Sequence, residues 1–208
     1  MIDANDLGAQ ADPVPLKMRS FALESTAPIA SEPITLDQAK QHLRVVFDDE
    51  NDYISSLVTA ARQMAEGALN RTLMQRSLTA TFDSSDSKFW LRKPPIVSVE
   101  SITVSDQYYV DTVLNADEYK LTPFAGGMLI RPGTGSTWLY SIQGGGMITV
   151  EYTAGYDVGS VPAPIIQWML LCIGTMYENR ETMSAGVQIY DMPADFMRWL
   201  LQPYMVYE

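Results

Sequence analysis

The side chains that could carry out chemistry in this chain are few. His42 is the single histidine, so neither a histidine-dependent catalytic triad nor a metal site with several histidine ligands can form within one subunit. The carboxylates of Asp106, Asp111 and Glu118 could serve general acid–base catalysis, which requires two acids close together in a cleft. Their spacing does not indicate such a pair, so a carboxylate-dependent hydrolase or lyase is only an alternative interpretation.

An acidic run formed by Asp48, Asp49, Glu50 and Asp52 invites comparison with a calcium site. It fails the EF-hand pattern, because Tyr53 stands where the turn-forming glycine belongs. Acidic side chains are favourable at the start of a helix, and a solvated, helix-capping run explains the pattern better. We therefore expect no metal, no cofactor and no catalytic residue.

Two other patterns could in principle bind phosphate groups. The glycines at 144–146 precede a predicted strand, whereas a phosphate-binding glycine loop follows a strand and opens a helix. Lys88, Arg92 and Lys93 lie beside two aromatic residues, but three cations are too few to indicate nucleic-acid binding. A loop and a strand edge are the preferred interpretations.

Composition narrows the classes of function. The 208 residues include 25 acidic and 14 basic side chains, for a formal net charge of −11. This balance argues against a groove that neutralises phosphates, although an acidic surface suits a passage through which DNA must slide without being held. The single cysteine, Cys172, is expected in the core of a protein from a reducing compartment. Neither a secretory signal nor a membrane-spanning segment is predicted.

The first part of the chain predicts an extended arm and two helices. Residues 1–33 contain four prolines and no sustained helical or strand period, which is typical of an extended arm. Thr35 followed by Gln38 is a capping-box pattern and predicts a helix over 35–45. Apolar residues recurring every three or four positions predict a second helix over 49–70, with Asn70 at its end.

A third helix is predicted over 162–179. Pro162 and Pro164 suit its first turn. Apolar residues cover nearly its whole circumference, as in a helix that is central in a fold or lies between subunits. The candidate core or intersubunit residues are Ile165, Trp168, Met169 and Ile173.

Between the second and third helices, short β-rich runs predict an antiparallel sheet region over about 73–153. Glycine and proline pairs separate these runs, which cover 78–82, 89–92, 97–104, 119–122, 128–131 and 147–152. The expected fold class is α+β: a small helical bundle with an inserted antiparallel β-sheet region and extended N- and C-terminal arms.

Several of these segments, in this order, resemble the head-tail connector (adaptor) proteins of tailed bacteriophages. They are Ile34 to Arg44, the acidic run, the long helix, the turn Tyr152-Thr153-Ala154-Gly155-Tyr156, then Val161-Pro162 and an apolar helix ending in Tyr177-Glu178-Asn179-Arg180. The resemblance covers roughly residues 34–180. It divides the chain into an arm over 1–33, a connector domain over 34–182 and a C-terminal docking segment over 183–208.

The resemblance implies a structural, non-catalytic protein of the virion neck. In that family, identical subunits form a ring, typically of twelve copies, beneath the portal vertex and extend the DNA channel towards the tail. The implied partners are further copies of the chain, the portal protein and a tail-side neck or tail-completion protein, without a membrane. DNA passes through the lumen without specific binding, and the acidic run at 48–52 or the acidic side of the inserted sheet is expected to face it.

The C-terminal segment of this family often inserts against the portal. The resemblance therefore assigns portal docking to the aromatic side chains of Phe196, Trp199, Tyr204 and Tyr207. Truncation after Pro193 is expected to leave a folded protein that no longer joins portal-bearing heads.

A second alternative to the connector is a non-catalytic, β-type carbohydrate- or protein-binding module. It rests on four aromatic residues in the sheet region, Tyr108, Tyr109, Trp138 and Tyr140. Stable monomeric behaviour with affinity for glycans would favour it.

Overall fold

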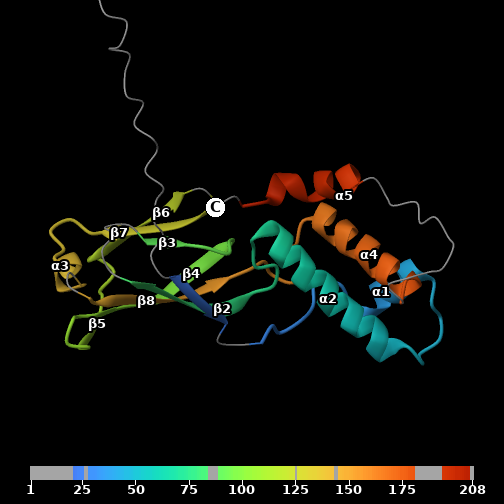
Figure 1. Ribbon diagram of the computed structural model, residues 1–208, viewed down its shortest axis with the longest axis horizontal. Helices are drawn as coiled ribbons and strands as arrows, with labels where there is room; N and C mark the ends of the chain where they lie inside the picture. The colour runs from blue at the N-terminus through green and yellow to red at the C-terminus, as the bar shows by residue number, and fades with distance from the viewer. Residues whose placement is uncertain are drawn as a thin grey trace, which may run out of the picture.

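The computed structural model describes residues 21–25, 28–83, 89–124, 126–142, 145–180 and 194–206. Most of the helices gather at one end of the molecule, and the strands lie at the other end together with one short helix (Figure 1). This arrangement confirms the α+β class. Phe196 lies within a helix whose backbone alone is described at that position, and Tyr207 lies outside the described residues.

The helical end contains α1 (Leu36–Leu43), α2 (Asn51–Leu69), α4 (Ala163–Glu178), α5 (Ala194–Leu201) and the 3-10 turn η1 (Gln202–Tyr204). The predicted capping box is confirmed, since the Thr35 hydroxyl accepts from the Gln38 backbone and the Gln38 side chain accepts from the Thr35 backbone. Asn70 ends α2 in the left-handed conformation, as predicted. The predicted third helix corresponds to α4, with Pro162 at its N-cap.

The core of the helical end lies between α1, α2, α4 and the C-terminal segment. Ile165, Trp168, Met169 and Ile173 of α4 are all buried there, together with apolar residues of α2 and with Leu201 of α5. These four side chains of α4 are thus part of the core of the chain itself.

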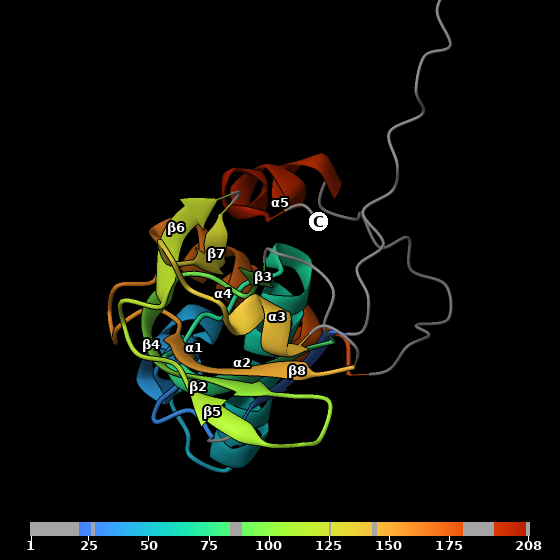
Figure 2. The same ribbon diagram turned by 90° about the vertical axis from the view of Figure 1, so that its left-hand side faces the viewer.

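The strand end is made of two antiparallel sheets. The larger has the order β1 (Phe21–Ser25), β2 (Arg76–Asp83), β8 (Met147–Ala154), β4 (Ile96–Ser105) and β5 (Asp111–Val113). The smaller has the order β3 (Phe89–Leu91), β7 (Gly127–Pro132) and β6 (Tyr119–Phe124). The smaller sheet and the short helix α3 (Trp138–Ile142) lie on one side of the larger sheet (Figure 2). A second apolar core fills the space between them.

Three details differ from the sequence-based prediction. The arm contains a strand, β1, which pairs with β2 at the edge of the larger sheet. The inserted region forms two sheets instead of one, because β3, β6 and β7 pair only with one another among the described strands. The segment around Trp138 forms α3, and the short strand β5 was not predicted.

The turn at Gly155 joins the two ends of the molecule. Gly155 has φ +123°, and a Cβ there would collide with the backbone of Met74. Its N–H donates to the Pro95 carbonyl at 2.8 Å, and the Tyr156 N–H donates to the Leu73 carbonyl at 3.1 Å. Only glycine allows this close approach, which fixes the end of β8 against the segment between α2 and β2.

Candidate functional site

The acidic turn at residues 48–52 connects α1 to α2, and cations neutralise part of it. Lys40 of α1 lies 2.6 Å from Asp48, and this hydrogen bond, followed by that from Asn51, lowers the pKa of the Asp48 carboxyl. Asp49 and Asp52 are exposed. Asp48 is therefore bound to α1, whereas the side chains of Asp49 and Asp52 face solvent.

Glu50 ties the acidic turn to the end of α4. It accepts hydrogen bonds from the Tyr177 hydroxyl and from Arg180, and these bonds, the tyrosine's first, hold the pKa of its carboxyl below the ordinary value. The Arg180 guanidinium also lies over the rings of Tyr53, at 4.6 Å, and Tyr177, at 4.9 Å. These contacts hold Arg180, which follows α4, against the acidic turn.

A buried ion network that the sequence did not predict crosses the protein. Arg62 of α2 donates to Glu32 at 2.7 Å and to Glu66 at 3.0 Å. Glu66 also accepts from Arg76 of β2 at 3.1 Å and from the Leu73 N–H at 2.9 Å. Its one visible signal was the four-residue spacing of Arg62 and Glu66 in a predicted helix. The network joins the segment before α1, α2 and β2.

The outward face of the larger sheet, which we call the sheet face, is acidic. Its strands carry five exposed carboxylates, Glu24, Asp83, Glu100, Asp111 and Glu151. Uncharged hydroxyls donate to three of them: Ser98 and Thr153 to Glu100, Ser101 to Glu151, and Ser105 to Asp111. The one cation in these five strands, Arg76, binds Glu66 of α2. The negative charge of this face is therefore not neutralised by its own strands.

The C-terminal segment packs on the helical end of the same chain. Leu201 is only 2% exposed, the Val206 N–H donates to the Leu69 carbonyl at 3.0 Å, and the Tyr204 carbonyl accepts from Arg71. Trp199 is 66% exposed, whereas Tyr204 is half-buried. Truncation after Pro193 would expose part of the core, so a point substitution at Trp199 tests docking better.

Two of the three candidate acids of the hydrolase alternative stabilise a local turn, and the third, Asp111, accepts from the Ser105 hydroxyl on the sheet face. Asp106 accepts from the N–H groups of Tyr108 and Val110, and Glu118 accepts from the Asn115 N–H at 2.8 Å. Among the described residues, no group of three or more His, Cys, Asp or Glu side chains is placed to hold a metal ion. Burial raises the pKa of the Cys172 thiol to about 11, which disfavours the reactive thiolate.

The aromatic residues of the binding-module alternative do not form one surface. Trp138 is only 5% exposed, and its indole N–H donates to the Glu118 carbonyl at 2.9 Å. Tyr108 and Tyr109 are exposed at the β4–β5 turn, and Tyr140 is exposed on α3. Within the part of the chain that the structure describes, no helix has the length and apolar character needed to cross a membrane.

Comparison with known proteins gives one family and one fold. Residues 33–116 match the family described as phage gp6-like head-tail connector protein. No curated protein sequence is significantly similar to the chain. Among solved structures, a chain from the virion of a native gene transfer agent (GTA) particle has a TM-score of 0.71 and 21% identity, over 89% of this chain and 96% of that chain.

Two further solved structures have the same fold. A chain from the neck of an empty GTA particle, computed with C6 symmetry, has a TM-score of 0.70, and one from the neck of a native GTA particle, computed with C12 symmetry, has 0.67. Both are 18% identical, over 90% of this chain and 96% of the other. The shared fold therefore extends well beyond the residues that match the family.

Proposed function

Because residues 33–116 match the phage gp6-like head-tail connector family, we propose that this chain belongs to that family and forms a closed ring of about twelve copies between the portal and the tail. It is a structural, non-catalytic component of the neck, at the head–tail interface of a phage or GTA particle. The ring extends the DNA channel and binds the portal protein on one side and a tail-side neck or tail-completion protein on the other.

The observation that carries this proposal is the agreement between the family match and the fold. The family match covers α1, α2 and strands β2 to β5, while the fold shared with GTA neck chains covers nine-tenths of the chain. The structures of those necks were computed with C6 and C12 symmetry, which supports a cyclic assembly here as well. Ring closure satisfies a head-to-tail contact without leading to a fibre.

The acidic residues suggest which surface faces the DNA. Of the two candidates, the acidic turn has Lys40 and Arg180 bound to Asp48 and Glu50. The carboxylates of the sheet face receive hydrogen bonds from neutral hydroxyls, which orient the charge without cancelling it. We therefore assign the channel wall to the sheet face, because fixed negative charge keeps a sliding polyanion from adhering.

The portal contact is assigned to the C-terminal segment. Trp199 projects from α5 and is free to fill a pocket on another protein, as an aromatic anchor does. Phe196 and Tyr207 remain proposed contacts of the same segment. Tyr204 would contribute its partly exposed ring while its backbone stays bound to Arg71.

The mass of the purified protein tests the proposal. Light scattering and negative-stain imaging would be done on the protein alone and then with portal-bearing capsids. A ring, or a monomer that becomes a ring only on the portal, is the expected result. A monomer that persists and ignores the portal would overturn the proposal.

A further inference from the structure

The smaller sheet is basic, in contrast to the larger one. Residues 89–93 and 117–133, which form this sheet and its ends, contain four cations, Arg92, Lys93, Lys120 and Arg131, and two carboxylates. The carboxylates are those of Asp117, which is exposed, and Glu118, which accepts from a nearby backbone N–H. In a chain with a net charge of −11, this sheet is therefore a local region of positive charge.

The register of the three strands decides which side chains point away from the core. Five apolar side chains of this sheet pack into the second apolar core: Phe89, Leu91, Leu121, Met128 and Ile130. Because side chains alternate along a strand, their neighbours point to the opposite face. We call this outer surface the basic face: Trp90 of β3, Lys120, Thr122 and Phe124 of β6, and Arg131 of β7.

Two like charges lie directly opposite each other on the basic face. Lys120 and Arg131 are register partners in β6 and β7, and both are exposed. Within the part of the chain that the structure describes, neither forms an ion pair. Like charges in directly opposite positions of an antiparallel pair are destabilising. An anionic group bound between them would remove this repulsion.

Aromatic side chains continue the basic face next to this pair. The Trp90 indole lies across β7, where a Cβ at Gly127 would collide with it, and its N–H donates to the Phe124 carbonyl at 3.2 Å. The Arg92 guanidinium lies 5.7 Å from the centroid of the same ring, and Phe124 is 60% exposed. Cations beside a fixed aromatic surface suit an acidic, partly apolar peptide.

The first sixteen residues of the chain, which we call the acidic arm, have that composition. They contain three carboxylates, Asp3, Asp6 and Asp12, and no cation, together with several apolar residues. Lys17 and Arg19 come after them in the sequence. The acidic arm lies outside the described residues. Its charge is complementary to that of the basic face.

The chain enters the described structure next to the basic face. Phe21, the first residue of β1, pairs with Phe82 of β2, whose ring packs against Phe89 of β3 with 5.5 Å between the centroids. Phe89 pairs in turn with the β7 residue that precedes Arg131. Residues 17–20 can span roughly 15 Å, whereas packed sheets lie about 10 Å apart. The acidic arm can therefore reach the basic face of its own chain.

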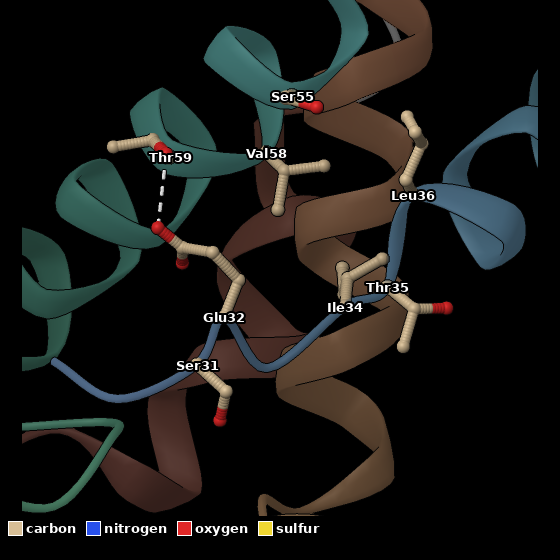
Figure 3. A pocket seen from close by; sticks show the side chains of 8 residues that line it. All are labelled: Ser31, Glu32, Ile34, Thr35, Leu36, Ser55, Val58 and Thr59. Carbon is tan, nitrogen blue, oxygen red and sulfur yellow. Dashed lines mark hydrogen bonds between the residues drawn. The ribbon is translucent and has the colours of Figure 1, made fainter. Parts of the chain in front are cut away.

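A pocket at the helical end does not suit the acidic arm. Its described lining residues include Glu32, whose carboxylate accepts from the Thr59 hydroxyl at 2.9 Å, but no lysine, arginine or histidine (Figure 3). The exposed Asp52 lies one turn from Ser55, another lining residue. The sheet face, with five exposed carboxylates, is equally unsuitable. Charge thus directs the arm to the smaller sheet.

We propose that the acidic arm binds the basic face of its own chain, with its aspartates near Lys120 and Arg131 and its apolar residues on Trp90 and Phe124. Attachment to the same chain gives the arm an effective concentration on the order of millimolar, so weak contacts suffice. This contact does not depend on the proposed ring. As a consequence, the smaller sheet presents no free cations to which DNA would adhere.

Disulfide capture in the full chain tests the contact. Gln10→Cys is combined either with Thr122→Cys on the basic face or with Thr79→Cys on the sheet face. Thr79 is the matched control, because it is also a half-buried threonine and its strand, β2, lies directly beside β1. Under mild oxidation, the Thr122→Cys variant should form a disulfide within one chain roughly tenfold faster or more. Cys172 stays in place because it is buried.

The charge dependence of this capture is the second measurement. Lys120→Glu with Arg131→Glu should slow capture at Thr122→Cys to the rate of the control, and so should about 1 M salt, where the Debye length is only about 3 Å. Arg44→Glu, an exposed charge reversal at the helical end, should leave the rate unchanged. Melting temperatures verify that each variant is folded.

The remaining outcomes would overturn the proposal. Equal capture at Thr122→Cys and Thr79→Cys, or rates that ignore salt and charge reversal, would show that the arm does not dock on the basic face. Disulfides between chains would assign the face to the arm of a neighbouring copy. DNA binding by the unaltered chain that is lost in Lys120→Glu, Arg131→Glu would make DNA the occupant of the face.

Discussion

Arg62 and Glu66 form a buried ion pair one turn apart on α2, with 3.0 Å between the guanidinium and the carboxylate. Arg62→Ala leaves Glu66 and Glu32 without this partner in the interior, so we expect the free energy of unfolding to fall by about 3–5 kcal/mol. Urea denaturation measures the change. Asp48→Asn, which breaks an exposed pair with Lys40, is the control and should have little effect. If the free energy of unfolding fell equally in both variants, the buried network would stabilise the fold no more than an exposed ion pair does.

The Glu50 interactions predict acid sensitivity. Because the folded protein lowers the pKa of this carboxyl, its stabilising contribution is present above the pKa of an unfolded glutamate, about 4.3. That contribution is lost as the pH falls through the lower, folded pKa. The difference in melting temperature between the unaltered protein and Glu50→Gln should therefore be largest near pH 7 and shrink towards pH 3. Asp49→Asn controls for the change in net charge, and a difference that does not vary with pH would refute the assignment.

Gly155 is predicted to tolerate no side chain. In Gly155→Ala the new Cβ meets the Met74 backbone in a positive-φ conformation, which should cost roughly 2–4 kcal/mol. Gly159→Ala is the matched control, since it also has positive φ but open space around it, and should cost about 1 kcal/mol. Chemical denaturation of both variants checks the difference, which would vanish if the close approach at Gly155 had no role.

Trp199→Ala is expected to separate docking from folding. The side chain is mostly exposed, so the melting temperature should hardly change while joining to portal-bearing heads falls. Leu201→Ala, two residues further along α5, should instead lower stability by about 2–5 kcal/mol because it opens the core. Co-sedimentation with capsids, together with thermal denaturation, distinguishes the two. Full joining by Trp199→Ala would place the portal contact elsewhere.

The assignment of the channel wall predicts an effect on DNA passage. Glu151→Lys places a cation on the sheet face in every copy of the ring, so DNA release from assembled particles should slow and recover at high salt. Asp49→Lys makes the same charge reversal at the acidic turn and should leave release unchanged. A slowing caused by Asp49→Lys alone would move the channel wall to the acidic turn.

Local sequence patterns predicted the elements that rely on local interactions. The capping box of Thr35 and Gln38, the stop at Asn70 and Pro162 at the start of α4 all act within a few residues, and the structure confirms each of them. Strand β1 was missed because its pairing with β2 involves residues more than fifty positions away. A five-residue run next to prolines carries no local signal of such a partner.

The sequence by itself determined the fold class and the charge of this protein: an acidic α+β chain with a recognisable order of helices, turn and strands. Only the tertiary structure decided which charges and apolar groups are free to meet a partner. The ion pairs of Arg62 with Glu32 and of Arg76 with Glu66 join different segments of the chain, so no periodic pattern in the sequence predicts them. Trp138 is buried while Tyr109 is exposed for the same reason, because burial depends on which distant segments pack against a residue.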